Sequence, residues 1–174
     1  MGPQNSLLRM DAYSTASWSA AFAAITGASA ALTGLLFVAL SINLSQVIKG
    51  PGLVGRAIEV LVLLTSVLII STLLLMPAQP AGAVAVEVLS IGVLTEVLLA
   101  SIHLRAPRRL LQVTRLNFTM RVIGAHVGPI FLILGSASLF VQNGGGLYWI
   151  VPAMVASMVA AIIGAWVMLV EIVR

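Results

Sequence analysis

The sequence predicts an all-α protein, an integral membrane bundle of five transmembrane helices. Composition is the first reason, because 60% of the 174 residues are apolar, 8% are charged and the mean hydropathy is +1.14. Such values lie outside the range of soluble domains. The second reason is the pattern: glycine, proline and charged residues divide the chain into five apolar segments, each long enough for the ~20 residues of a membrane helix. We therefore expect one transmembrane domain, residues 1–174.

The first two helices are predicted at residues 17–48 and 53–76. The sequence KGPG separates them, because Gly50, Pro51 and Gly52 do not continue a helix. At ~1.5 Å per residue the first segment would be ~48 Å long against a hydrocarbon core of ~30 Å, so we expect it to tilt or to protrude. The first ten residues lack the basic start, short apolar core and cleavage site of a secretory signal, so we expect the first helix to be retained.

The other three helices are predicted at residues 81–104, 121–141 and 147–173. The segment PAQP precedes the third helix, RAPRR follows it, and QNGGG separates the last two. The fourth helix begins with a GxxxG pair, Gly124 and Gly128, and small residues also recur along the fifth. Because small residues allow membrane helices to approach closely, this small-xxx-small pattern predicts tight helix packing.

Lysine and arginine residues predict the orientation of the helices, because loops rich in them stay on the cytoplasmic side. They occur in the loops after the first and third helices and at the C-terminus, whereas the second and fourth loops have none. With five helices, all these basic segments fall on one side. We therefore expect an outside N-terminus and a cytoplasmic C-terminus, in the cell inner (plasma) membrane. The basic residues on that side are Lys49, Arg56, Arg105, Arg108, Arg109, Arg115, Arg121 and Arg174, and Arg9, before the first helix, is the one exception.

One face of the first helix is lined by small residues. Positions at heptad spacing carry nothing larger than valine, and this spacing suits the left-handed crossing usual in membrane bundles. Two interpretations remain open: close packing within one subunit, or a symmetry axis of a homo-oligomer, where the face forms an oligomer seam or a pore wall. The candidate face consists of Gly27, Gly34, Val38, Ser41 and Ser45, with Asn43 at its polar inner end, and Ala20, Ala24 and Ala31 extend it.

Ionisable side chains inside the predicted helices are the candidate functional residues. A charge at the middle of a bilayer costs roughly 2.5 to 3.5 kcal/mol on the insertion scale, so such residues need a partner or a function. Glu59, Glu96 and His126 lie at similar depth and form one buried cluster if their helices adjoin. The cluster is either a pathway for a proton or another cation, or a structural network in which Arg56 or Arg121 pairs with a glutamate.

Enzymatic chemistry is not expected. The sequence has no cysteine, and it contains no HExxH, GxSxG or phosphate-binding glycine loop. Its two histidines, in different helices, do not make a metal site, so we expect neither a metal nor a cofactor. The net charge of +4 comes from basic residues beside hydrophobic segments, where the positive-inside rule accounts for them. Nucleic acid is therefore not an expected partner.

Three stretches of the sequence resemble a known family: TGASAALTGLLFVALSINL, PGLVGRAIEVLVLL and AWVMLVEI. They are similar to small bacterial multi-pass membrane proteins, some of which are labelled modulators of the FtsH membrane protease. That resemblance implies a membrane protease complex as a partner. Separately, LTGLLFVALSI is similar to the pore-lining helix of Orai calcium channels. Gly34 is at the position of the hinge glycine and Val38 is near the hydrophobic gate, whereas Ile42 replaces the selectivity glutamate.

Passage of a small ion or solute through a homo-oligomer is the function that the sequence favours, as in a channel or transporter. The path would follow either the small face of the first helix or the buried glutamates. The alternative is a non-transporting accessory or regulatory protein, whose basic inner loop and helix faces dock a membrane protease or another membrane complex. For both functions we expect the helices to be in contact with the lipid bilayer.

Overall fold

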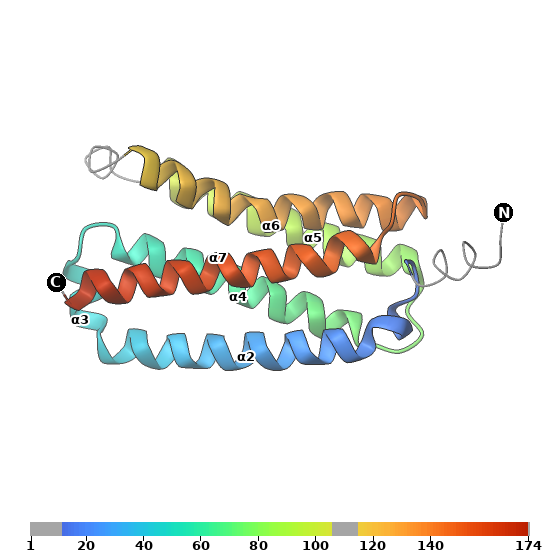
Figure 1. The fold of residues 1–174 in the computed structure, drawn as a ribbon, viewed down its shortest axis with the longest axis horizontal. Helices are drawn as coiled ribbons and strands as arrows, with labels where there is room; N and C mark the ends of the chain where they lie inside the picture. Colours follow the sequence, from blue (N-terminus) through green and yellow to red (C-terminus); the bar gives the residue numbers. More distant parts are fainter. Residues whose placement is uncertain (1–11, 106–114, 174) are drawn as a thin grey trace.

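The protein is all-helical. Figure 1 shows the computed structural model, which describes residues 12–105 and 115–173. Five helices of this described part are long and apolar enough to cross a membrane, which confirms the predicted fold class and makes the chain a multi-pass membrane protein. The first ten residues and Arg108, Arg109 and Arg174, on which predictions were based above, lie outside the described residues. The elements are η1 (Thr15–Trp18), α2 (Ser19–Ile42), α3 (Leu44–Lys49), α4 (Leu53–Leu74), α5 (Ala81–Leu104), α6 (Arg115–Val141) and α7 (Leu147–Val173).

The long helices alternate in direction, so the bundle has two ends (Figure 1). The basic end, on the left in Figure 1, contains α3, the start of α4 and the last turn of α7. The aromatic end contains the N-terminal segment and the α6–α7 loop, where the rings of Trp18 and Tyr148 pack edge to face with centroids 4.9 Å apart. Which end faces the cytoplasm stays a prediction. The basic end is named after its described cationic residues, Lys49, Arg56, Arg105 and Arg121.

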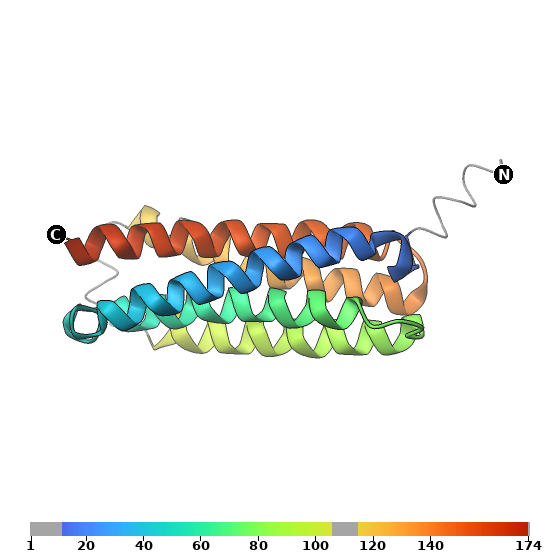
Figure 2. The same ribbon diagram turned by 90° about the horizontal axis from the view of Figure 1, so that it is seen from below.

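Four helices form a ring, and the fifth packs outside it. Neighbouring pairs in the ring are α4 with α5, α5 with α6, α6 with α7, and α7 with α4. Helix α2 packs mainly against α4 and touches α7 only slightly (Figures 1 and 2). Accordingly, α4 is the most buried of the five helices and α2 the least. The first helix of the sequence is therefore peripheral in the single subunit.

The core of the bundle divides into two apolar clusters. One lies toward the aromatic end and contains Phe22, Ile70, Leu132 and Ile150, all fully buried. The other lies toward the basic end and includes Leu99. In the aromatic half of the bundle, the core consists of large apolar side chains. Among the described residues, it contains no charged group.

The first predicted helix, 17–48, is divided in the structure. Helix α2 ends at Ile42, and Asn43 adopts a non-helical conformation, with φ −104° and ψ 17°. The amide Nδ2 of Asn43 donates to the carbonyl oxygen of Ala39 at 2.9 Å, so this polar side chain bonds to the backbone of the last turn. The separate helix α3 follows at the basic end (Figure 1). The excess length is thus accommodated by a break in the helix.

The fourth helix begins at Arg115, ahead of the predicted start at residue 121. Its apolar span begins only at Phe118, so hydropathy located the part that suits a membrane and missed the polar first turn. Two glycines of α6 set its distance from α7. A Cβ atom on Gly128 would lie 2.9 Å from the carbonyl oxygen of Ala153, and one on Gly135 would lie 2.8 Å from Ile150. Gly128 and Gly135 therefore allow a close contact of α6 and α7. Gly124, the other member of the predicted GxxxG pair, takes no part in it, because a Cβ atom there would meet no atom within 4 Å.

Candidate functional site

Five ionisable side chains connect α4, α5 and α6 near the basic end. Arg121 donates from Nη2 and, at 3.3 Å, from Nε to the carboxylate of Glu59. Nε2 of His103 lies 3.1 Å from Oε2 of the same carboxylate. Nδ1 of His103 lies 3.0 Å from Nε2 of His126, and Nδ1 of His126 lies 2.5 Å from Oε2 of Glu96. We call these five residues, joined in the order Arg121, Glu59, His103, His126 and Glu96, the Glu–His cluster.

Helix geometry explains why these side chains meet. Glu96 and His103 are seven residues apart on α5, so they project from one face, two turns or ~10 Å apart. Helix α6 lies beside α5 in the opposite direction, and His126 extends one ring nitrogen toward each of them. Glu59 reaches His103 from α4, which packs on the other side of α5. The cluster is therefore formed where three helices of the ring converge.

Burial makes the Glu–His cluster costly unless its charges are compensated. The side chains of Glu59 and His103 are 5% and 9% exposed, and the other three are also largely covered. A buried carboxylate needs a counter-charge and hydrogen-bond donors. Glu59 has both, because Arg121 supplies a positive charge and both Arg121 and His103 contact its oxygens. These contacts also hold three helices together.

The two glutamates end the cluster differently. Both oxygens of Glu59 are occupied, since Arg121 contacts the two and His103 contacts one of them. At Glu96 only Oε2 is bonded, whereas Oε1 is buried and has no hydrogen-bond partner among the described residues. The cluster therefore has a closed end at Glu59 and an open end at Glu96.

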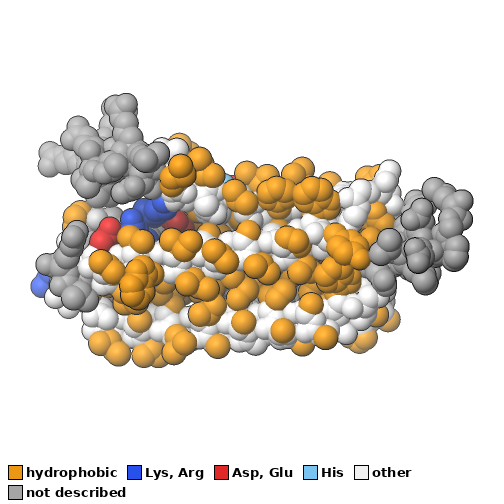
Figure 3. All heavy atoms as spheres, viewed as in Figure 1, with side chains coloured by type: hydrophobic (Ala, Val, Ile, Leu, Met, Phe, Trp, Pro, Cys, Tyr) orange, Lys and Arg blue, Asp and Glu red, His pale blue; other side chains and the backbone are white. Residues whose placement is uncertain are grey.

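A second ion pair lies close to the cluster at the basic end. Nη1 of Arg56, one turn before Glu59 on α4, lies 3.1 Å from Oε2 of Glu171 on α7. Glu171 is about half exposed, at 46%. Figure 3 shows charged side chains gathered at this end, while the rest of the visible face is mostly hydrophobic. The ion pairs of the described residues thus all lie toward the basic end of the bundle.

The structure brings together the three ionisable residues that the sequence singled out, and His126 and Glu96 are in direct contact. Glu59 and Glu96 are joined through both histidines. His126 contacts Glu96 but does not contact Glu59. Of the two arginines proposed as partners, Arg121 pairs with Glu59. His103 is the residue that sequence reasoning missed, because it lies near the end of its helix. Its seven-residue spacing from Glu96 was the available signal.

The small-residue face predicted on the first helix is exposed in the single subunit, and the break at Asn43 places Ser45 on α3 while its other small residues lie on α2. Every residue of the candidate face except Asn43 is exposed, and a Cβ atom on Gly27 or Gly34 would meet no atom within 4 Å. The hydroxyl of Ser41 donates to the carbonyl oxygen of Phe37, one turn earlier on α2 itself. Packing of this face within one subunit, one of the two interpretations of the sequence, is therefore wrong. The face is the outer surface of the single chain.

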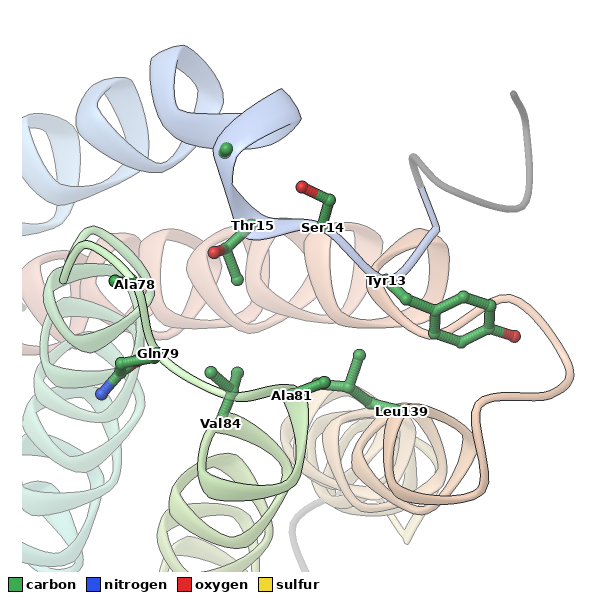
Figure 4. Close-up of a pocket in the computed structure, with 9 residues that line it drawn as sticks. Tyr13, Ser14, Thr15, Ala78, Gln79, Ala81, Val84 and Leu139 are labelled. Atoms are coloured by element: carbon green, nitrogen blue, oxygen red, sulfur yellow. The ribbon is translucent and has the colours of Figure 1, made fainter. Parts of the chain in front are cut away.

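A cavity of about 290 Å³ lies at the opposite, aromatic end (Figure 4). The segment before α2, with Tyr13 and Thr15, forms one side of it, and Gln79 from the α4–α5 loop lines another. The amide nitrogen of Gln79 donates to both carboxylate oxygens of Glu87 at 3.2 Å. Glu87 is thus bonded locally at the aromatic end, on the same helix as Glu96 but apart from the Glu–His cluster.

Comparison of the chain with protein families, with curated proteins and with solved structures finds no match. The resemblance to bacterial multi-pass proteins and to the Orai pore helix therefore stays a prediction from the sequence.

Proposed function

We propose that the protein passes a small cation across the membrane and that the Glu–His cluster is the site that handles it. The observation that carries this proposal is the unbroken series of contacts from Glu59 to Glu96 inside three membrane-length helices. Ionisable residues inside membrane helices are expensive and commonly mark ion pathways and proton relays. Carboxylates and imidazoles also provide negative charge and lone pairs, which suit a cation better than an anion.

An open, water-filled pore down the middle of the subunit is not part of this proposal. The core of the aromatic half is filled by large apolar side chains such as Ile70 and Leu132. We therefore infer stepwise handling of the cation at the cluster, as in a transporter. The proposed orientation has the basic end in the cytoplasm of a bacterial cell, with the protein in the inner membrane. We propose no enzymatic reaction and no cofactor.

Reconstitution in liposomes tests the proposal. An imposed membrane potential is expected to drive flux of at least one of H⁺, Na⁺ and K⁺ through the wild-type protein, and Glu96→Gln is expected to reduce it to the level of empty liposomes. Glu87→Gln is the matched control, because it makes the same change on the same helix outside the cluster. Its flux is expected to equal that of the wild type. Absence of flux of all three ions in the wild type would overturn the proposal.

We also propose that copies of the protein assemble through α2. Support comes from the small-residue face around Gly27 and Gly34, which is left uncovered in the single subunit. In lipid, no hydrophobic effect drives helices to associate. Small residues favour association because they let the helix backbones approach closely. A pore wall on this face would form only between copies. The mass of the protein in detergent tests the assembly, and a strict monomer at all protein concentrations would contradict it.

A non-transporting accessory role is the second candidate, and the same uncovered face of α2 favours it. In that role α2 would contact a different membrane protein, such as a membrane protease, in place of a second copy. The two candidates predict different results. Absence of ion flux together with stable copurification of one membrane complex would favour the accessory role, and a Gly34→Leu variant should then lose that complex.

A further inference from the structure

We propose that Glu96, His126, His103 and Glu59 form a proton relay that holds one proton at each of its three contacts. This inference rests on the proposed function, because it names the proton as the cation that the Glu–His cluster handles. The contacts measure 2.5, 3.0 and 3.1 Å, and each joins two groups that bind protons. The groups follow one another in series, as a relay requires, whereas a coordinated metal ion needs several ligands that converge on one point.

The proton count follows from the contacts themselves. A contact without a proton would place two lone pairs against each other at hydrogen-bond distance, and a contact with two protons would oppose two donors. Both arrangements are repulsive, so each contact is stable only with a single proton. Three contacts in series therefore hold three protons among the four side chains.

This count makes the Glu–His cluster neutral as a whole. Two neutral imidazoles hold two of the protons, and two bare glutamates contribute two negative charges. The third proton leaves the four side chains with one negative charge, and Arg121 on Glu59 cancels it. Beyond the cluster, the charged groups nearest to it from α4 and α7 are Arg56 and Glu171, which compensate each other. A neutral cluster is the form that costs least inside a membrane.

Three short transfers move the third proton along the cluster. In one limiting state, Glu96 is protonated and donates to Nδ1 of His126, Nε2–H of His126 donates to Nδ1 of His103, and Nε2–H of His103 donates to Glu59. When each proton crosses its own contact, three O–H or N–H bonds break and three form. Glu59 is then protonated and Glu96 is ionised. One positive charge has moved from α5 to α4 without displacement of any side chain.

The two ends of the relay differ in their hydrogen bonding. The unbonded Oε1 of Glu96 accepts an incoming proton without loss of the contact between Oε2 and His126. At the other end, both oxygens of Glu59 are bonded, and this carboxylate lies nearer the basic end. After a transfer, the proton of His126 lies on Nδ1 and faces Glu96. Each further proton therefore requires both imidazole rings to turn.

Flux measurements with a matched control test the transfer. Liposomes that contain a pH-sensitive dye are expected to show proton movement under an imposed potential, with Na⁺ and K⁺ flux followed in parallel. His126→Gln is expected to abolish proton movement, because an amide can bond to both neighbours but does not titrate. Glu87→Gln is expected to retain the full rate, and thermal melting verifies that both variants are folded.

The outcomes separate the relay from the proposed function. Flux of Na⁺ or K⁺ without proton flux would overturn the relay and leave the proposed function standing. Proton flux that persists in folded His126→Gln would also overturn the relay and leave the proposed function standing. Absence of flux of every ion in the wild type would overturn both.

The proton count is tested on the wild-type protein, so this test does not depend on the folding of a variant. NMR spectra of ¹⁵N-labelled histidine and ¹³C-labelled glutamate report which ring nitrogens and carboxylates carry protons. Three protons among the four side chains near neutral pH are the expected result. Two protons, with both glutamates ionised and both imidazoles neutral, would overturn the relay whatever the flux.

Discussion

Nδ1 of His126 lies 2.5 Å from Oε2 of Glu96, where α6 packs against α5. The other nitrogen of the same ring lies 3.0 Å from His103. One imidazole therefore joins the open end of the Glu–His cluster to the residues around Glu59. A substitution of Glu96 therefore changes the hydrogen bonding of His126, which also contacts His103. Its effects on stability and on flux can be measured separately.

Glu96→Leu should destabilise the protein more than Glu96→Gln. The amide keeps a hydrogen bond to His126, whereas leucine leaves Nδ1 of that ring buried without a partner, at a cost of about 1 to 3 kcal/mol. The free energy of unfolding in one detergent measures the difference. Glu96→Gln is expected to remain close to the wild type. A loss as large in Glu96→Gln as in Glu96→Leu would mean that the charge of Glu96, and not its hydrogen bond, stabilises the fold.

Arg121→Gln should be far more damaging than Arg56→Gln. The former leaves Glu59, with its side chain 5% exposed, without its cationic partner, and we expect a loss of about 2 to 4 kcal/mol of unfolding free energy. The partner of Arg56 is Glu171, which is 46% exposed, so its loss should cost about 0 to 1 kcal/mol. Denaturant unfolding of the two variants provides the comparison. Equal losses would contradict the distinct roles of the two pairs.

Gly128→Ala should weaken the contact of α6 with α7, whereas Gly124→Ala should be tolerated. The added methyl at Gly128 would lie 2.9 Å from the carbonyl oxygen of Ala153, so the helices must move apart, at about 1 to 3 kcal/mol. The methyl at Gly124 meets no atom within 4 Å, and its effect should stay within about 0.5 kcal/mol. Melting temperatures of the purified variants test the pair. The reverse order would contradict the described packing.

Gly34→Leu should leave the single subunit folded but reduce its assembly. A Cβ atom at Gly34 would meet no atom of another helix within 4 Å, so we expect the substitution to affect contacts between copies and not the fold of the subunit. Leu35→Ala is the control on a neighbouring exposed face, where Leu35 is 69% exposed. The mass in detergent should fall for Gly34→Leu and stay unchanged for Leu35→Ala. Equal masses for both variants and the wild type would indicate that the small-residue face contacts lipid.

Reporter fusions test the predicted orientation. A reporter that is active only in the periplasm should be silent when fused after Arg174, because the basic loops are expected to stay in the cytoplasm. The same reporter inserted at Gly145, in the α6–α7 loop of the aromatic end, should be active. Activity in the opposite pattern would reverse the orientation of the whole bundle.

The number and approximate extent of the helices were predictable from the sequence, because hydropathy and helix-breaking residues act locally. The breaks at Pro51, at the loop before Ala81 and at the glycines after Val141 each separate two helices in the structure. The break at Asn43 was not predicted, since a single asparagine is compatible with a helix. The start of α6 was also missed, because its first turn is polar and hydropathy reports only the membrane-compatible part.

The sequence by itself thus determined the five apolar helices and the depth of Glu59, Glu96 and His126 along them. Only the tertiary structure decided which partners these residues have, because depth says nothing about the rotation of a helix or the identity of its neighbours. That rotation pairs Glu59 with Arg121 and makes His103 the link between the glutamate on α4 and the histidine on α6. It also places the small-residue face of α2 outside the ring, since the other four helices close their core without it.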